Sequence, residues 1–298
     1  MQDIDDKKWI KTKQRGSGVG VFIVYLFFKI FGYVGLYVVL FFVVLYFTLT
    51  TPKLKKHLKE YYLLNTGKFN FFIYYKHIYT FALVVSDRMF SKRYLSRYQI
   101  SIHNLKLINL ENNGIIFLSS HIGDWALGGN VLTQKNVPIN IVMEEITKQS
   151  IQSFEKSIKD ENINEMKIID LSEGQIAVAF KIAKALQNRE IVAMMADRYL
   201  SIPSSIPVEF LGKKIRINKN PFEVAYNRKV PLVAIFTLRI GTYKYDSFYY
   251  TLTPFDYSMA KKDAISNVAQ KYADLMEKIV KQYPDQWFNH YDYFGSEA

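Results

Sequence analysis

An apolar stretch at residues 21–49 constrains the fold most, because Lys29 is its one charged residue. Residues 30–49 carry no charge, and a helix of that length can cross the hydrocarbon core of a bilayer. The stretch is too long for a cleaved signal peptide, and no small-residue cleavage site follows it. We therefore expect it to hold the protein at a membrane.

Two features favour a helical hairpin or a shallow interfacial anchor over a single crossing. Gly32 and Gly35 interrupt the stretch, which predicts a first helix ending near Ile30 and a second helix starting near Tyr33. Both flanks are basic, and a single crossing would carry one of them across the membrane, against the positive-inside tendency. The basic residues are Lys7, Lys8, Lys11, Lys13 and Arg15 before the stretch and Lys53, Lys55, Lys56 and Lys59 after it.

The charge of the chain narrows the choice of partner. The net charge is +12, and residues 51–97 hold ten lysines and arginines against Glu60 and Asp87, interleaved with tyrosines and phenylalanines. Such a block is found in nucleic-acid-binding proteins. Directly after an apolar stretch, attraction to anionic lipid headgroups is the simpler interpretation. We therefore predict an anionic membrane surface as a partner and no nucleic acid.

The chain contains no cysteine and only five scattered histidines. The lack of cysteine excludes disulfides, thiol nucleophiles and iron–sulfur clusters held by cysteine. No pair of histidines has the spacing of zinc ligands. We therefore predict that the chain holds no metal.

From residue 100 onward, short apolar runs alternate with stretches of helical spacing, which predicts an α/β fold with a central, mostly parallel sheet flanked by helices. The predicted buried strands are Gly114–Ser120, Ile139–Met143, Met166–Asp170, Arg189–Ala196 and Val230–Leu238, with a more polar strand at Tyr243–Thr253. The predicted helices are Glu145–Lys159, Gly174–Asn188 and Lys261–Gln282. We divide the chain into a membrane anchor at 1–50, basic amphipathic helices at 51–100 and an α/β domain at 101–298.

A histidine follows the first of these strands. Ser119 and Ser120 end the apolar run, His121 comes next, and a helix is expected to begin near Asp124. Ligand sites of open α/β sheets lie at the carboxyl ends of strands. A histidine that a carboxylate orients there can act as a general base on a hydroxyl. The alternative is structural: Asp124 caps the helix and His121 fills space. Residue spacing alone leaves both open.

The segment His121-Ile122-Gly123-Asp124-Trp125 resembles the HxGNW-acid signature of the bacterial lipid A biosynthesis (lauroyl/myristoyl) acyltransferase family, within the lysophospholipid acyltransferase-like superfamily. Further segments similar to those of the family occur in its order over nearly the whole chain. They are Trp9 with Arg15-Gly16-Ser17, Thr80-Phe81-Ala82 with Ser86-Asp87-Arg88, Ala196-Asp197-Arg198, Phe210-Leu211-Gly212-Lys213, and Pro284-Asp285-Gln286-Trp287-Phe288. The resemblance implies a glycerolipid-acyltransferase-like fold.

The resemblance also implies an activity. A fatty acyl group would pass from the thioester of an acyl-carrier protein or of CoA to a hydroxyl of a lipid A precursor or of a related glycolipid or lysolipid. His121 would take the proton of that hydroxyl. A thiolate is a good leaving group, so the reaction requires no metal, acyl-enzyme or cofactor beyond the thioester co-substrate. The implied location is the cytoplasmic face of the bacterial inner membrane.

One position departs from the signature of the family. The signature has an acid five residues after the histidine, where this chain has Ala126. Either Asp124 takes over that role, or a carboxylate distant in the sequence does, or the chain is catalytically impaired and binds lipid without turning it over. We take His121 and Asp124 as the candidate catalytic residues.

Three further residues are candidates for substrate binding. Asp197 and Arg198 follow an apolar strand, and the guanidinium of Arg198 suits a phosphate of the acceptor or of the phosphopantetheine of the carrier. A surface ion pair between these two neighbours is the alternative. Lys213 belongs to a basic turn that suits an anionic headgroup, unless the turn is an ordinary solvated hairpin. His290 and the aromatic residues beside it are predicted to pack rather than to react.

Overall fold

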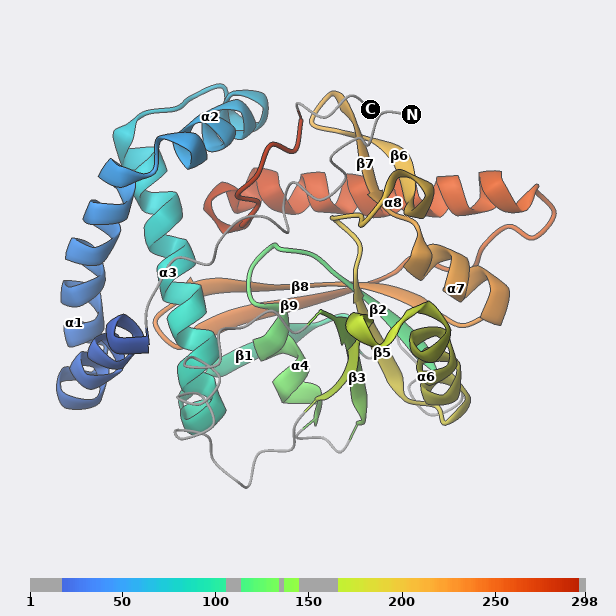
Figure 1. Ribbon diagram of the computed structural model, residues 1–298, viewed down its shortest axis with the longest axis horizontal. Helices are drawn as coiled ribbons and strands as arrows, with labels where there is room; N and C mark the ends of the chain where they lie inside the picture. Colours follow the sequence, from blue (N-terminus) through green and yellow to red (C-terminus); the bar gives the residue numbers. More distant parts are fainter. Residues whose placement is uncertain (1–17, 106–113, 134–136, 145–165, 295–298) are drawn as a thin grey trace.

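The computed structural model describes residues 18–105, 114–133, 137–144 and 166–294. Within these residues, three N-terminal helices stand beside an α/β unit built on a seven-stranded sheet (Figure 1). The predicted α/β class, with a mostly parallel sheet flanked by helices, is confirmed. The helix predicted at Glu145–Lys159 lies outside the described residues.

The apolar stretch forms α1 (Gly18–Thr50), which is bent at Gly32. Gly32 has φ 60° and ψ −144°, a conformation that residues with a Cβ rarely adopt. Gly35 permits close approach of the backbone after the bend, because a Cβ at this position would collide with Phe27 and Phe31. The predicted break between two helices is therefore confirmed. Figure 1 shows the longer arm of α1 running beside α3.

The chain continues with α2 (Pro52–Thr66) and α3 (Phe71–Tyr94), and α3 lies against α1. The ring of Phe90 on α3 stacks on that of Phe28 on α1, with 3.9 Å between ring centroids. The hydroxyl of Tyr79 on α3 donates to the backbone carbonyl of Tyr37 on α1 at 3.1 Å. Both arms of α1 are thus held by α3.

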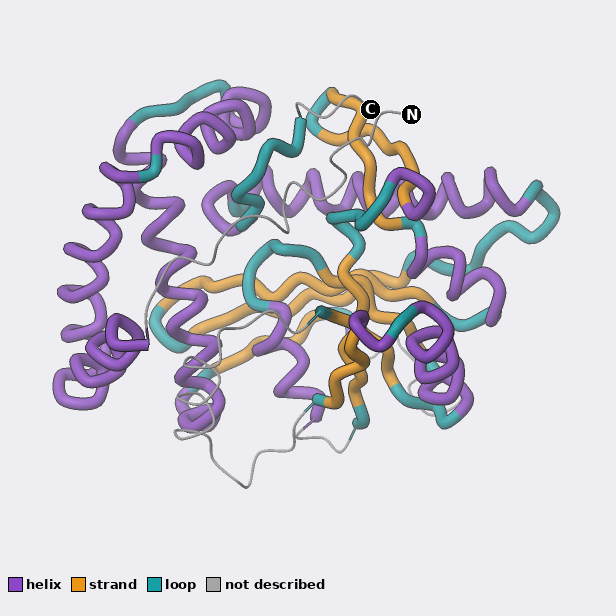
Figure 2. The backbone as a smooth tube through the Cα atoms, viewed as in Figure 1, coloured by secondary structure: helices purple, strands orange, loops and turns teal. Residues whose placement is uncertain are grey.

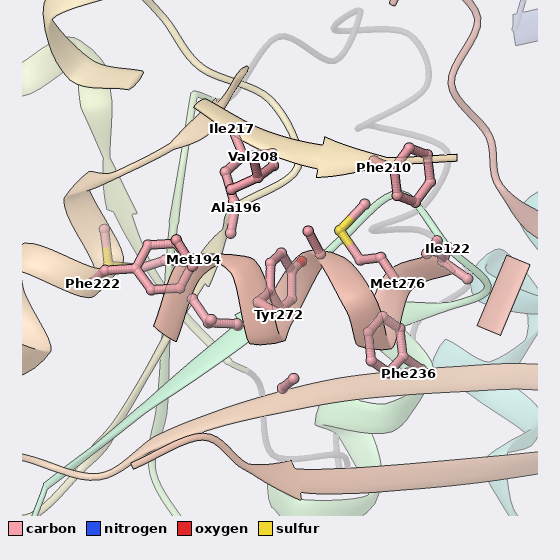
Figure 3. Packing of buried hydrophobic residues seen from close by; sticks show 14 of the residues in the cluster. Ile122, Met194, Ala196, Val208, Phe210, Ile217, Phe222, Phe236, Tyr272 and Met276 are labelled. Carbon is pink, nitrogen blue, oxygen red and sulfur yellow. The ribbon is translucent and has the colours of Figure 1, made fainter. Parts of the chain in front are cut away.

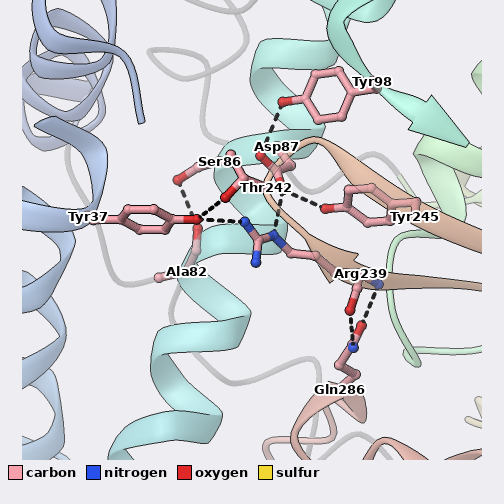
Figure 4. A network of polar contacts seen from close by, with 9 residues as sticks. All are labelled: Tyr37, Ala82, Ser86, Asp87, Tyr98, Arg239, Thr242, Tyr245 and Gln286. Atoms are coloured by element: carbon pink, nitrogen blue, oxygen red, sulfur yellow. Dashed lines mark hydrogen bonds and ion pairs between the residues drawn. The ribbon is translucent and has the colours of Figure 1, made fainter. Parts of the chain in front are cut away.

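A buried polar network joins α3 to the sheet and to α1 (Figure 4). Asp87 of α3 accepts hydrogen bonds from Arg239 Nε at 2.9 Å and from the hydroxyls of Tyr245 at 2.6 Å and Tyr98 at 3.1 Å. Arg239 Nη2 also donates to the hydroxyl of Tyr37 at 3.3 Å. Burial raises the pKa of Asp87 to about 6, although the charge of Arg239 opposes this rise. Both carboxylate oxygens are engaged, so the network fixes α3 on the sheet.

The main sheet has the strand order β1-β9-β8-β2-β5-β3-β4, and each neighbouring pair is parallel except β8 and β9. Its strands are β1 (Gln99–His103), β2 (Ile115–Ser119), β3 (Ile139–Met143), β4 (Lys167–Asp170), β5 (Ile191–Met195), β8 (Leu232–Gly241) and β9 (Lys244–Thr251). An antiparallel pair, β6 (Ser205–Phe210) and β7 (Lys213–Asn218), forms a second sheet. The six predicted strands are all present. β1, β6 and β7 were not predicted, because their exposed polar residues interrupt any continuous apolar run.

The other α-helices in the described part of the chain follow individual strands. They are α4 (Trp125–Thr133), α6 (Gln175–Gln187), α7 (Asn220–Arg228) and α8 (Lys261–Gln282), with short 3-10 turns at Leu95–Arg97, Leu171–Glu173, Ile202–Ser204 and Pro284–Gln286. The helices predicted at 174–188 and 261–282 are confirmed.

Helices cover both faces of the sheet (Figure 2). Alternate residues of β2 show this, because successive side chains of a strand point to opposite faces. Ile116 and Leu118 belong to the core shared with α6, α7 and α8. Ile115 and Phe117 belong to the core shared with α4. Figure 3 shows the first of these cores, with Tyr272 of α8 in its centre.

Candidate active site

His121 lies just beyond the carboxyl end of β2, in a turn that is pinned to neighbouring segments. Gly123 has φ +65°, and a Cβ there would collide with the backbone of Thr237 on β8. The next backbone N–H, of Asp124, donates to the carbonyl of Thr237 at 2.7 Å. The turn therefore follows one path, and that path sets the position of the imidazole.

A carboxylate distant in the sequence faces this imidazole. His121 Nδ1 lies 3.0 Å from each of the two carboxylate oxygens of Asp197, and the backbone N–H of His121 donates to Asp197 Oδ2 at 3.0 Å. Asp197 follows β5, and β5 pairs with β2 in parallel, so the carboxyl ends of both strands meet at one edge of the sheet. The Asp197 side chain is fully buried, whereas a quarter of the His121 side chain is exposed.

The charges of the pair follow from its surroundings. Burial and then the charge of Arg198 lower the pKa of His121, although Asp197 opposes them. Burial alone would raise the pKa of Asp197, but the charge and hydrogen bonds of His121 hold it below its usual value. At neutral pH the imidazole is neutral and the carboxylate ionised. Asp197 then selects the tautomer protonated at Nδ1, which leaves the lone pair on Nε2.

Asp124, the predicted partner of His121, makes other contacts. Its Oδ1 accepts from Arg88 Nε at 2.9 Å and from the backbone N–H groups of Ala126 at 3.2 Å and Leu127 at 3.3 Å. Asp124 therefore caps α4 and neutralises Arg88 on α3. This corrects the expectation that Asp124 orients the histidine. The distant carboxylate, one of the three alternatives, is the one that the structure places beside His121.

Arg198 points toward the C-terminal segment, residues 284–294, and does not form the surface ion pair. Its Nη2 donates to the carbonyl of Phe288 at 3.0 Å, and its guanidinium lies 5.1 Å from the centre of the Tyr291 ring. Its Nε is buried without a hydrogen-bond partner in the described part of the chain. Arg198 thus adjoins the His121–Asp197 pair and retains a free N–H donor.

Lys213 is not brought to the pair. It begins β7, whereas Asn218 at the other end of β7 donates from its backbone to the carbonyl of Ala196, beside Asp197. The five residue steps from Lys213 to Asn218 span about 17 Å in an extended strand. Lys213 is exposed at the far end of the hairpin.

The C-terminal segment contributes contacts that the sequence did not predict. The backbone N–H of Phe288 donates to the carbonyl of His121 at 2.7 Å, and the Tyr293 hydroxyl donates to the carbonyl of Asp197 at 2.8 Å. One short segment therefore holds the backbones of both members of the pair. The P-x-x-W-F close of the family was the one signal in this region, and it did not indicate these partners.

Comparison with known proteins places the chain in a family. A sequence profile described as bacterial lipid A biosynthesis acyltransferase matches residues 69–290. The chain belongs to this family. The profile covers α3, both members of the His121–Asp197 pair and most of the C-terminal segment, so the family resemblance of the sequence is confirmed.

Two curated relatives are similar to part of the chain. They are phosphatidylinositol mannoside acyltransferases from two strains of Mycobacterium tuberculosis, each 24% identical over 112 residues. The match covers 38% of this chain and 34% of each relative, so it spans about a third of the length of these relatives.

Proposed function

We propose that the protein is a membrane-associated O-acyltransferase. It transfers a fatty acyl group from an acyl-carrier protein or CoA thioester to a hydroxyl of a lipid A precursor or of a related glycolipid or lysolipid. The observation that carries this proposal is the His121–Asp197 pair, in which Nδ1 is bound to a buried carboxylate and a quarter of the ring side chain is exposed. The family supplies the acyl-transfer chemistry.

In this mechanism His121 acts as general base. Its Nε2 takes the hydroxyl proton of the acceptor while the hydroxyl oxygen bonds to the thioester carbonyl carbon and the carbonyl electrons move to oxygen. Asp197 stabilises the imidazolium that forms. When the carbonyl re-forms, the C–S bond breaks and the proton on His121 passes to the thiolate. Atoms and charge balance without an acyl-enzyme.

The name of the curated relatives guides the choice of acceptor. These relatives are acyltransferases of phosphatidylinositol mannoside, a lipid that carries sugar. The basic surface of this chain, with its net charge of +12, suits an acidic carrier protein as donor. We therefore test glycolipid hydroxyls first, with an acyl-carrier protein thioester before a CoA thioester.

The apolar helix supports a membrane location. Among the described residues, α1 is the one helix long and apolar enough to cross a membrane, and 28% of its most apolar 18-residue stretch is buried. Yet both arms are held by the protein, through Phe28 on Phe90 and Tyr79 on Tyr37. We propose that α1 lies bent in one leaflet at the cytoplasmic face of the bacterial inner membrane, with both basic flanks on that side.

A catalytically impaired lipid-binding protein of the same fold is the second candidate, and Ala126 favours it. Ala126 occupies the position of the family's acid and is buried near the start of α4. The two candidates differ in the activity of the wild type. An enzyme in which Asp197 serves His121 transfers acyl groups and gains nothing from Ala126→Glu, whereas a protein that only binds lipid transfers none with or without this change.

The test is an acyl-transfer assay with the purified full chain in detergent. Acyl-carrier protein and CoA thioesters are offered with a lipid A precursor, a phosphatidylinositol mannoside and a lysophospholipid, and products are identified by mass spectrometry. We expect transfer by the wild type and none by His121→Ala, while the matched control His103→Ala stays active. Absence of transfer by both the wild type and Ala126→Glu would leave the lipid-binding candidate.

A further inference from the structure

Polar atoms without partners gather where the C-terminal segment meets the His121–Asp197 pair. In the described part of the chain, Arg198 Nε and His290 Nε2 are buried and make no hydrogen bond. Each buried polar group that is left unpaired costs about 1–3 kcal/mol. Two unpaired nitrogens beside the His121–Asp197 pair are therefore available to a ligand.

His290 lies between α3 and the pair. Its ring centroid is 4.7 Å from that of Phe81 and 5.9 Å from that of His77, both on α3. Burial lowers its pKa well below the usual value, and the charge of Arg198 lowers it further. Residues on either side of His290 contact the site: the backbone N–H of Phe288 donates to the His121 carbonyl, and the Tyr291 ring lies 5.1 Å from the Arg198 guanidinium. His290 is therefore a neutral imidazole near both.

The two nitrogens suit an oxygen that becomes negatively charged. Arg198 Nε can only donate, and Nη2 of the same guanidinium is already fixed on the Phe288 carbonyl. A neutral imidazole can also donate from Nε2 and polarise a carbonyl. His121 already accounts for the acceptor proton, so the group still lacking donors is the thioester carbonyl oxygen.

We propose that His290 Nε2–H and Arg198 Nε–H hold the thioester carbonyl oxygen and stabilise its negative charge in the transition state. This inference rests on the proposed acyl transfer. As the acceptor oxygen attacks the carbonyl carbon, the electron pair of the C=O bond moves to this oxygen, and it returns when the C–S bond breaks. Both nitrogens are buried, so the side chains that cover them must move for the thioester to reach them.

The experiment measures two rates of the purified full chain: acyl transfer to the acceptor, and hydrolysis of the same thioester without acceptor. The variants are His290→Phe, His290→Gln and Arg198→Lys, with His103→Gln on β1 as the matched histidine control. Melting temperatures check that each variant is folded. His290→Gln guards against a packing defect, because its side-chain amide can donate a hydrogen bond that phenylalanine cannot.

For His290→Phe we expect kcat of transfer and of hydrolysis to fall together by about 100- to 1000-fold, the usual effect of losing one such donor. The KM for the acceptor stays unchanged, and His290→Gln recovers part of the loss. If His290→Phe keeps both rates, or loses transfer alone with a raised acceptor KM, the inference is overturned while the proposed function stands. A wild type that neither transfers nor hydrolyses overturns both.

Discussion

Asp87 and Asp197 are both fully buried carboxylates beside a basic side chain, but their surroundings differ. Asp87 receives one guanidinium and two tyrosine hydroxyls, which occupy both of its oxygens. Asp197 binds one imidazole and the backbone N–H of the same residue. The basic partner of Asp87 is mostly buried, whereas a quarter of the His121 side chain is exposed.

The difference separates a structural ion pair from a reactive one. Burial raises the pKa of Asp87 to about 6, so its ionised form is retained at a cost to the fold. His121 holds the pKa of Asp197 low, so Asp197 is ionised and its negative charge can stabilise a positive charge on the imidazole. Asp87, with both oxygens hydrogen-bonded, therefore serves the fold. In the His121–Asp197 pair, Nε2 of His121 stays free and can accept a proton.

The largest expected effect is on the rate. Asp197→Asn cannot stabilise the imidazolium and no longer selects the Nδ1 tautomer, so we expect transfer to fall by about 10³- to 10⁴-fold. The melting temperature should stay within about 4 °C, since the amide keeps the shape of the side chain. Steady-state kinetics and calorimetry measure the two quantities. Asp246→Asn on β9 is the control, and a loss of activity common to both variants would contradict the comparison.

The next effect is on stability. Asp87→Ala leaves Arg239 buried without its counter-charge, so we expect the free energy of unfolding to fall by about 3–5 kcal/mol. The turnover of the folded fraction should hardly change. Urea unfolding followed by fluorescence measures the first, and an assay below the transition measures the second. The double change Asp87→Leu with Arg239→Met should recover much of the stability; failure to do so would show that the ion pair is not the cause.

A smaller effect is expected from the C-terminal segment. Tyr293→Phe removes the hydroxyl that donates to the Asp197 carbonyl, a bond of about 0.5–1.5 kcal/mol. If this bond positions Asp197, kcat falls by about three- to tenfold with an unchanged donor KM. Tyr291→Phe is the matched control. Equal rates for all three proteins would mean that the segment supports the fold and not the pair.

The smallest effect is a shift of the pH profile. The charge of Arg198 helps to lower the pKa of His121. Removing this cation in Arg198→Gln favours the imidazolium, so the pKa of His121 rises and the base is lost at a higher pH. The acid limb of kcat/KM should therefore move to higher pH, whatever the loss in maximal rate. If Arg198→Gln lowers the maximal kcat/KM but leaves the acid limb at the same pH, His121 is not the group that titrates.

The sequence was sufficient for much of the fold. Continuous apolar runs such as 115–119 and 191–195 predicted the buried strands, because such strands are covered on both faces. β1 and β7 were missed because exposed or half-buried polar residues separate their few apolar ones, so neither forms a continuous apolar run. The bend in α1 was predictable because glycine alone suits the backbone at residue 32.

The candidate site was predicted only in part. The position of His121 after an apolar run indicated a reactive histidine, and Asp197 was singled out for the same reason. Their contact was not predictable, because it requires β2 and β5 to be neighbours. The hydrophobic pattern of single segments does not determine the order of strands in a sheet. Asp124, three residues from His121, was the obvious local partner, but its Oδ1 binds Arg88 and the first backbone N–H groups of the helix that it caps.

The consecutive residues Asp87 and Arg88 have a mechanical consequence. Side chains of neighbouring helical residues leave the axis about 100° apart, and here one reaches Arg239 on β8 while the other reaches Asp124 at the start of α4. Because these two ion pairs hold α3 from different directions, α3 can neither rotate about its axis nor shift along it. If α1 lies in a bilayer, as proposed, α3 would bear the lateral tension on α1, and the position of the His121 imidazole would not change.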